Sequence, residues 1–195
     1  MELNNQLVVY YSDQRDPAHG QKIVHQVSSD LFTWGDVVQD TADPTYANRP
    51  GMPVVAALPN GQYLMTYEYG GTPFGFAAYY RLSADPLAFD AAPGYRIVAT
   101  DGTAPSSGPY VVWTPAGGEN GTIVAIASSH AAVFLNTALA APGSAWRKVA
   151  TPQTRSYTQS LRVLPDPNLI LLIGGGSLGG SANKVTVSVM NITAV

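Results

Sequence analysis

Few residues in this chain are suited to acid–base chemistry, since its 195 residues include only three glutamates. Glu2 is terminal and Glu119 lies in a glycine-rich turn, so both are expected to be solvated. Glu68 follows an apolar, aromatic strand, whose period of two places Leu64, Thr66 and Glu68 on one face. We therefore expect Glu68 to be a partly desolvated carboxylate available for catalysis. The structural alternative is an ion pair with a nearby arginine.

Two turns contribute arginines that suit sugar recognition. Arg15 follows one apolar strand and Arg49 enters the next repeat of the chain. A guanidinium group donates hydrogen bonds in a fixed geometry, which allows it to recognise hydroxyls and carboxylates. Together with Arg162, these residues meet only if the fold has a central axis; otherwise they are ordinary surface residues. Tyr157 is a candidate to donate a hydrogen bond to a carboxylate or to stack on a sugar, and alternatively a packing tyrosine.

Other kinds of site are not expected. The three histidines, His19, His25 and His130, have no metal-ligand spacing, so no metal site is predicted. The chain has neither a Gly-x-Ser-x-Gly motif nor a phosphate loop, since the glycine run 174–176 lacks the required Lys-Ser/Thr. No cofactor is therefore predicted.

Composition also restricts the partners. The net charge is −3 with no Lys/Arg run, so nucleic acid is not an expected partner. No run of apolar residues is long enough to span a membrane. Cysteine is absent, and the first residues do not resemble a signal peptide.

A repeat of about 55 residues organises the chain. Ser28–Trp34 (SSDLFTW) reappears as Ser83–Phe89 (SADPLAF), and a decayed third copy ends at Trp146. Each repeat orders its strands in the same way, with Asn-Gly or Asp-Pro-Asn turns between the first two; Asn-Gly is expected to supply the positive φ angles of a two-residue hairpin. The expected first strands are 53–58, 109–115 and 160–164; the second 63–69, 122–127 and 169–173; the third 77–82 and 132–136; the fourth 95–99 and 147–150.

Four strands per repeat of this length are typical of a propeller blade. Low charge (12%) with 19 Gly and 15 Pro agrees with many short strands. The prediction is one all-β domain, 1–195, of about three to three and a half four-stranded blades (1–45, 46–102, 103–152 and 153–195). The first blade is expected to lack its first strand and the last, ending at 185–190, to lack its fourth. An open arc of this kind exposes sheet faces that favour association.

The repeated Ser-x-Asp-x-x-x-aromatic motif resembles the Asp-box of sialidase-like propellers. In that motif the aspartate caps the backbone amides of a turn and the aromatic wedges between strands. Asp30, Asp85, Trp34 and Phe89 are therefore interpreted as structural residues.

Longer segments resemble one family. "YYSDQRDPAHGQKIVHQVSSDLFTW", "NRPGMPVVAALPNGQYLMTYEYGG", "SSGPYVVW" and "SYTQSLRVLP" are similar to glycoside hydrolase family 93, the exo-α-1,5-L-arabinanases with a six-bladed propeller, and the resemblance is to its C-terminal half. It implies a secreted enzyme that retains configuration through two glutamates and an assisting tyrosine. Glu68 resembles one catalytic carboxylate, interpreted as the nucleophile, and Tyr157 the tyrosine. The candidate substrate-binding residues are Asp13, Arg15, Arg49, Tyr67, Tyr110 and Arg155.

The chain departs from that family at the second glutamate, which lies just upstream of the strand that begins here at Leu7. Only Glu2 is available there, and its surroundings do not match. Retaining hydrolysis needs two carboxyl groups about 5–5.5 Å apart. We therefore expect an arabinanase-like chain that binds arabinan or a related plant polysaccharide but is inactive alone. The alternatives are a lectin-like half-propeller that closes the ring as a homodimer and, ranked last, a sialidase.

Overall fold

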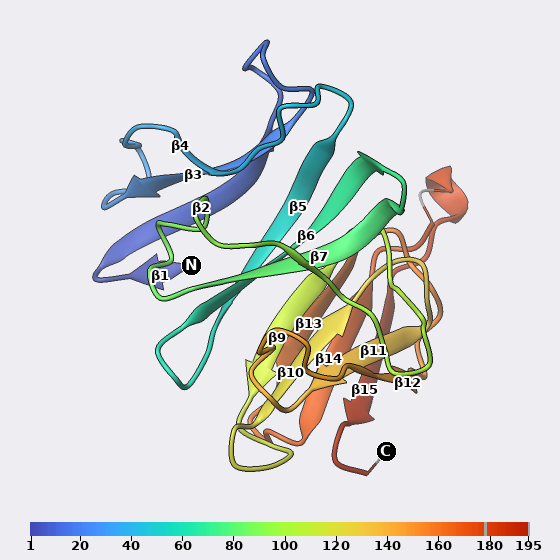
Figure 1. Cartoon of the computed structure of the whole chain (residues 1–195). Helices are drawn as coiled ribbons and strands as arrows, with labels where there is room; N and C mark the ends of the chain where they lie inside the picture. The colour runs from blue at the N-terminus through green and yellow to red at the C-terminus, as the bar shows by residue number, and fades with distance from the viewer. Residues whose placement is uncertain (178, 195) are drawn as a thin grey trace.

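The computed structural model describes residues 1–177 and 179–194, which form four antiparallel sheets arranged around a common centre (Figure 1). The all-β propeller arrangement is therefore confirmed. The first sheet contains β1 (Glu2–Leu3), β2 (Gln6–Asp13), β3 (Lys22–Ser28) and β4 (Val38–Thr41), and the second contains β5 (Arg49–Ala57), β6 (Tyr63–Thr72), β7 (Gly75–Ser83) and β8 (Tyr95–Arg96). The third sheet contains β9 (Tyr110–Thr114), β10 (Thr122–Ile126), β11 (Ala132–Asn136) and β12 (Arg147–Ala150). The fourth sheet contains β13 (Gln159–Val163), β14 (Leu169–Gly174) and β15 (Thr186–Asn191). A single-turn 3-10 helix, η1 (Gly180–Ala182), precedes β15.

The strand order predicted from the repeat is observed in the second and third sheets, and the fourth sheet ends at its third strand. The first sheet differs from the expectation. Glu2–Leu3 form a short first strand that pairs with β2, because the backbones of Met1 and Val8 exchange two hydrogen bonds of 2.8 Å. The first sheet is thus four-stranded.

The hairpin turns also differ from the expected type. Positive φ angles fall on Gly61 (81°) and Gly121 (66°), and neither Asn60 nor Asn120 shares them. Gly61 N–H donates to the Leu58 carbonyl (3.2 Å) and Leu58 N–H to the Gln62 carbonyl (2.8 Å). This is the geometry of a three-residue loop with a glycine bulge, so asparagine here needs no left-handed backbone.

The sheets pack face to face, and their cores follow from the two-residue alternation of the strands. Ile123 and Ala125 of β10 face the second sheet, while Val124 and Ile126 face the fourth. Every residue of β10 is therefore buried, and the strand reads as a continuous apolar run. A third cluster, which includes Met65, Tyr67 and Phe89, joins the first and second sheets.

The repeated motif forms capped turns at the far ends of the third strands. Asp30 Oδ1 accepts from the backbone N–H of Phe32 (2.8 Å) and Thr33 (2.7 Å). In the third sheet Asn136 ends β11 as Ser28 ends β3, and it caps the following turn, since its Oδ1 accepts from the backbone N–H of Ala138 and Ala140 (2.9 and 2.8 Å). The turns after the third strands of the first and third sheets are therefore both capped, by different polar side chains.

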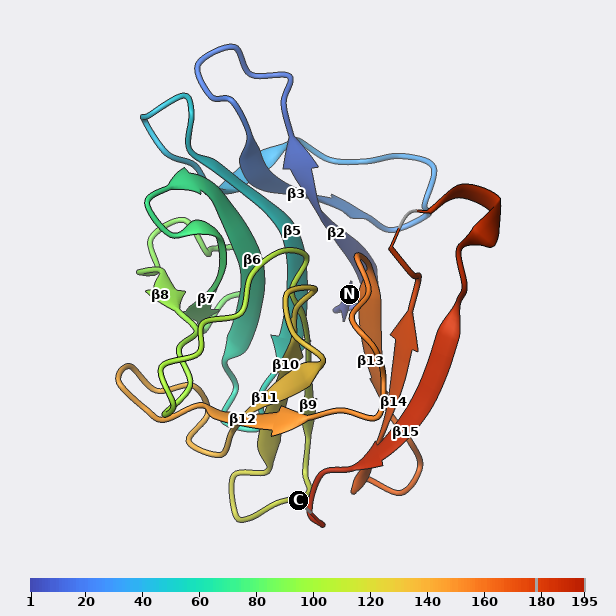
Figure 2. The ribbon, with the colours of Figure 1, turned by 90° about the vertical axis from the view of Figure 1, so that its right-hand side faces the viewer.

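The arc brings the inner strands β5, β9 and β13 side by side, with β2 next to β5 (Figure 2). Within the described residues, no helix has the length and apolar character needed to cross a membrane.

Candidate functional site

The candidate residues gather at one end of the sheets because the strands are antiparallel. In each sheet the first, innermost strand and the second strand run in opposite directions, so the start of the first strand and the end of the second lie at the same edge. At this edge β6 carries Glu68 opposite Gly51 of β5. β2 ends there with Asp13, and Tyr157 lies just before β13. One rim therefore receives residues from the first, second and fourth sheets.

Glu68 occupies the face that the alternation predicts. Leu64 and Thr66 on this face are fully buried, and the Glu68 side chain is half-buried at the strand's end. Its Oε2 accepts a hydrogen bond from the backbone N–H of Gly108 (2.9 Å), which lies in the loop leading into β9 of the third sheet. Among the described residues no cation lies within ion-pair distance of this carboxylate, so the arginine pairing considered above is not observed. A backbone amide holds the carboxylate in place.

Gly108 is the point where three sheets meet. Its φ of +53° is left-handed, and a Cβ at this position would lie 3.1 Å from the Tyr157 carbonyl oxygen and 3.3 Å from Met52 Cε and Ser128 Oγ. Met52 itself has a φ of 54°, at a bulge in β5. The close approach needs a glycine, because the backbone geometry and the space both disfavour a side chain.

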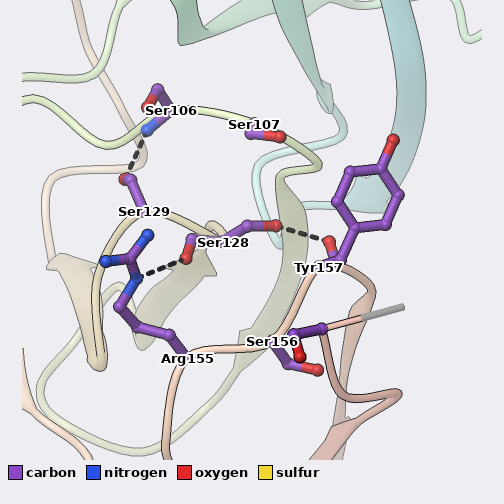
Figure 3. A pocket seen from close by; sticks show the side chains of 8 residues that line it. Ser106, Ser107, Ser128, Ser129, Arg155, Ser156 and Tyr157 are labelled. Atoms are coloured by element: carbon purple, nitrogen blue, oxygen red, sulfur yellow. Dashed lines mark hydrogen bonds between the residues drawn. The ribbon is translucent and has the colours of Figure 1, made fainter. Parts of the chain in front are cut away.

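Tyr157 belongs to a cavity of about 470 Å³ lined mostly by serines, which we call the serine pocket (Figure 3). Its lining residues are Ser106, Ser107, Ser128, Ser129, Arg155, Ser156, Tyr157 and Ser177. The Tyr157 side chain is 44% exposed. Its backbone N–H donates to the Gly176 carbonyl (2.7 Å), and its carbonyl accepts from Ser128 Oγ. The phenol is thus available to a ligand while the backbone is fixed.

Arg155, another predicted binding residue, lies in the same pocket. Its Nε donates to the Ser128 carbonyl (3.1 Å). Figure 3 shows the guanidinium beside Ser128 and Ser129, with the ring of Tyr157 directed away from it. The structure therefore brings Arg155 and Tyr157 into one cavity, next to the residue that binds Glu68.

Asp13 and Arg15 form a local pair on the rim. Arg15 Nε and Nη2 donate to the two oxygens of the buried Asp13 carboxylate (2.8 and 2.9 Å), and the backbone N–H of Arg15 adds a third bond (2.9 Å). Hydrogen bonds from Arg15 lower the pKa of Asp13 to about 2, and the same bonds, with one to the Tyr11 hydroxyl (3.0 Å), raise the pKa of Arg15. Asp13 therefore stays ionised and orients an exposed guanidinium.

Arg49 is exposed on the same rim. Its Nη2 contacts Gln21 Oε1 (3.4 Å), an atom that also accepts from Gln14 Nε2 (2.8 Å). Close by, the Tyr69 hydroxyl donates to Asp43. The pKa of this phenol is raised, mainly by burial and also by the neighbouring Asp43 carboxylate. Arg49 thus joins the polar network at the rim, whereas Arg162 lies near the opposite end of β13.

Two predicted binding residues are placed elsewhere. The Tyr67 side chain is 1% exposed and packs with Tyr69 and Tyr79 between the first and second sheets, because it alternates with Glu68 and faces the other way. Burial raises its pKa. Tyr110 lines a smaller cavity of about 170 Å³ with Met52 and Thr158. Tyr67 is therefore a core residue, and Tyr110 is a neighbour of the serine pocket.

The serines were the residues that sequence reasoning missed. Ser106-Ser107 precede β9 and Ser128-Ser129 follow β10, so both pairs lie at the rim end of the third sheet. A signal was present in the two Ser-Ser pairs that flank one expected hairpin. Their meeting with residues 155–157 depends on the packing of the fourth sheet.

The chain's two other glutamates are distant from this rim. Glu2 lies at the opposite end of β2, in a shallow cavity beside the turn that contains Asp30. Glu119 is exposed in the turn between β9 and β10. No cluster of side chains able to hold a metal ion occurs in residues 1–177 and 179–194.

Comparison with solved structures relates this arrangement to known enzymes. The chain superposes on the family 93 α-L-arabinofuranosidase of Fusarium graminearum solved with arabinobiose, with a TM-score of 0.96 and 46% identity over 100% of this chain and 57% of that one. An α-L-arabinanase of Penicillium chrysogenum, also complexed with arabinobiose, gives a TM-score of 0.94 and 47% identity over 100% and 57%. The chain therefore spans little more than half the length of these proteins.

A more distant likeness shows the fold alone. An exo-β-1,3-galactanase of Clostridium thermocellum gives a TM-score of 0.66 at 14% identity, over 100% of this chain and 45% of that one. No protein-family model and no curated protein sequence matches the chain.

Proposed function

Because the chain belongs to glycoside hydrolase family 93, over its full length, we propose that its rim forms part of an arabinan-binding glycosidase site, with Glu68 as one of two catalytic carboxylates. The observation that carries the proposal is the setting of Glu68. This half-buried carboxylate is held by the Gly108 amide at the point where the Tyr157 backbone also makes contact. The arabinobiose complexes of the two relatives support an arabinose-based ligand.

The geometry suits Glu68 to the role of nucleophile. One hydrogen bond from Gly108 orients the carboxylate through Oε2, and among the described residues no donor binds Oε1. In a retaining reaction Oε1 attacks the anomeric carbon, the bond to the leaving sugar oxygen breaks, and a second carboxyl group protonates that oxygen. Water then releases the sugar. We propose that Tyr157, whose side chain is 44% exposed, donates a hydrogen bond to the reacting carboxylate or to the sugar ring.

In residues 1–177 and 179–194, no second glutamate lies at this rim. Glu2 is at the other end of the first sheet and Glu119 is in an exposed turn. Asp13 is held ionised by Arg15, and a group with its pKa lowered to about 2 is a poor proton donor. Loss of general acid catalysis alone costs about 10²–10⁴ in rate. We therefore propose that the chain by itself binds arabinose oligosaccharides and cleaves them very slowly or not at all.

A direct test combines cleavage and binding. Linear α-1,5-arabinan is incubated with the purified chain and released sugars are analysed, while arabinobiose binding is measured by calorimetry. The expected result is binding without measurable release. Tyr157→Phe is expected to weaken binding several-fold, and Glu119→Gln, an exposed glutamate in a distant turn, serves as the control. Absence of arabinobiose binding at millimolar concentration would refute the proposal.

Release of sugar by the wild-type chain would change the conclusion. If Glu68→Gln abolished that release and Glu119→Gln did not, Glu68 would be catalytic and a second carboxylate would have to come from this chain or a second copy. The assignment of Glu68 would be overturned if its variant cleaved as fast as the wild type.

A second candidate is a carbohydrate-binding protein that dimerises. The first and fourth sheets, at the two ends of the arc, favour it, because they expose Leu7 and Val9 on β2 and Val187 and Val189 on β15. Exposed apolar rows of this kind often mark interfaces. Sedimentation equilibrium gives the test: a species of twice the monomer mass that Val187→Lys/Val189→Lys dissociates is the expected result, and a stable monomer excludes this candidate. Secretion, which the family resemblance implies, stays a prediction.

A further inference from the structure

The serine pocket differs chemically from a site built only for a neutral sugar. Six serines line it, together with Arg155 and Tyr157, and the hydroxyls of Ser128, Ser129 and Ser156 already form hydrogen bonds within the protein. Among the described residues no carboxylate lines the cavity, so Arg155 is its only charged group. A volume of about 470 Å³ is sufficient for one or two sugar units.

Arg155 is fixed at one end and available at the other. Its Nε donates to the Ser128 carbonyl, and in the described part of the chain no acceptor is bound by its two terminal nitrogens. Arg155 forms none of the observed ion pairs. A guanidinium held through Nε presents its remaining N–H groups in a planar fork, which matches the two oxygens of a carboxylate.

The charged groups around the pocket leave it electropositive. Ser129 Oγ contacts His130 Nδ1 (2.7 Å), and burial, with the nearby charges of Lys148 and Arg155, lowers the pKa of this histidine. Lys148 is paired with Asp101 (2.6 Å), which neutralises it. The carboxylate of Glu68 accepts a hydrogen bond from the Gly108 amide, and Glu68 is not one of the residues that line the cavity. The positive charge of Arg155 is therefore not neutralised within the pocket.

We propose that the serine pocket binds a carboxylate-bearing sugar, such as a uronic acid, with the carboxylate on Arg155 and the ring hydroxyls on the surrounding serines. This inference rests on the proposed function, since it places an acidic sugar unit beside the arabinose-binding rim. This pocket would then bind an acidic sugar unit more tightly than a neutral one. Serine hydroxyls both donate and accept, which suits ring hydroxyls, whereas the carboxylate requires the guanidinium.

The experiment compares two ligands that differ in one group, a charged carboxylate or its uncharged methyl ester. Binding of galacturonic acid and of its methyl ester is measured by calorimetry or NMR titration at pH 7 and low salt. Charge-assisted hydrogen bonds are about twice as strong as neutral ones, so the acid is expected to bind roughly tenfold more tightly than the ester. High salt is expected to reduce this preference.

Matched variants identify the residue responsible. Arg155→Gln is expected to abolish the preference for the acid, and Arg155→Lys, which keeps the charge but loses the fork, to retain part of it. Arg162→Gln makes the same charge change at an exposed position near the other end of β13 and is expected to leave the preference intact. Thermal unfolding of each variant confirms that the loop containing Ser128 is still folded.

The outcomes separate this inference from the proposed function. Equal binding of acid and ester, or an unchanged preference in Arg155→Gln, overturns the inference. If arabinobiose binds but the acid has no advantage, the proposed function stands alone. If the acid binds through Arg155 and arabinobiose does not bind, the pocket is an acidic-sugar site and the arabinan proposal fails. Binding of neither ligand overturns both.

Discussion

The third sheet and the two sheets at the ends of the arc, the first and the fourth, are built from similar strands but differ in burial. Every residue of β10 and β11 is buried, whereas Val187 and Val189 of β15 are 62% and 50% exposed. The difference arises from position, since the third sheet has a neighbour on each face. The fourth sheet packs on one side only, against β9 and β10.

This contrast shows where the arc obtains its stability. Burying apolar surface contributes roughly 25 cal/mol per Å², so a sheet covered on both faces gains about twice as much as one covered on a single face. The rim site follows the same pattern. Gly108, which binds Glu68, lies in the loop that leads into β9 of the doubly covered third sheet, while Asp13 ends β2 of the first sheet and Arg15 follows it.

The largest expected effect tests this contrast in the core. Phe134→Ala on β11 removes a fully buried ring from the third sheet and should lower the free energy of unfolding by about 3–5 kcal/mol. Val187→Ala on β15 removes an exposed side chain and should change it by less than about 0.5 kcal/mol. Urea unfolding measures both. Similar losses would show that the β15 face is covered in solution.

A smaller loss of stability is expected from replacing a glycine at the rim, and it can be compared with the same substitution at the tip of a hairpin. Gly108→Ala and Gly61→Ala both place a Cβ on left-handed backbone (φ 53° and 81°), at a cost of about 1–2 kcal/mol. Only Gly108 also has crowded neighbours, 3.1 Å away at the Tyr157 carbonyl oxygen, while nothing lies within 4 Å at Gly61. Gly108→Ala should therefore destabilise more and also weaken arabinobiose binding. Equal losses, with binding unchanged, would contradict the role assigned to Gly108.

The smallest effect concerns the acid sensitivity of the first sheet. The Asp13 pKa is lowered from 3.8 to about 2, so between these pH values the folded chain binds fewer protons than the unfolded chain. Its stabilising contribution is present above about pH 4 and is lost as the pH falls towards 2. Asp13→Asn should flatten this part of the profile of urea midpoint against pH.

Asp36→Asn provides the control, because Asp36 is exposed in the same sheet's loop and forms no ion pair in the described residues. If both variants gave the wild-type profile, the Asp13–Arg15 pair would contribute nothing to folding.

Most strands could be predicted from the sequence because the residue pattern that indicates a strand lies within the strand and the turns next to it. The expected range 132–136 coincides with β11, since an apolar run bounded by turns needs no tertiary information, and the range 147–150, expected from its place in the repeat, coincides with β12. The short strand at Glu2–Leu3 could not be read, because two residues carry no period and the pairing with β2 defines it. The turn type at Asn60-Gly61 was likewise decided by the hairpin register.

The candidate site divides in the same way. The sequence alone determined the blade repeat, the family, and the face of β6 that carries Glu68, because alternation along a strand is a local property. The same alternation places Tyr67 on the opposite face, but its burial follows from the first sheet packing there. The tertiary structure alone decided that Gly108 binds Glu68 and that residues 106–107, 128–129 and 155–157 enclose one pocket. These groups come from separate sheets, and only the packing of neighbouring sheets sets their distances.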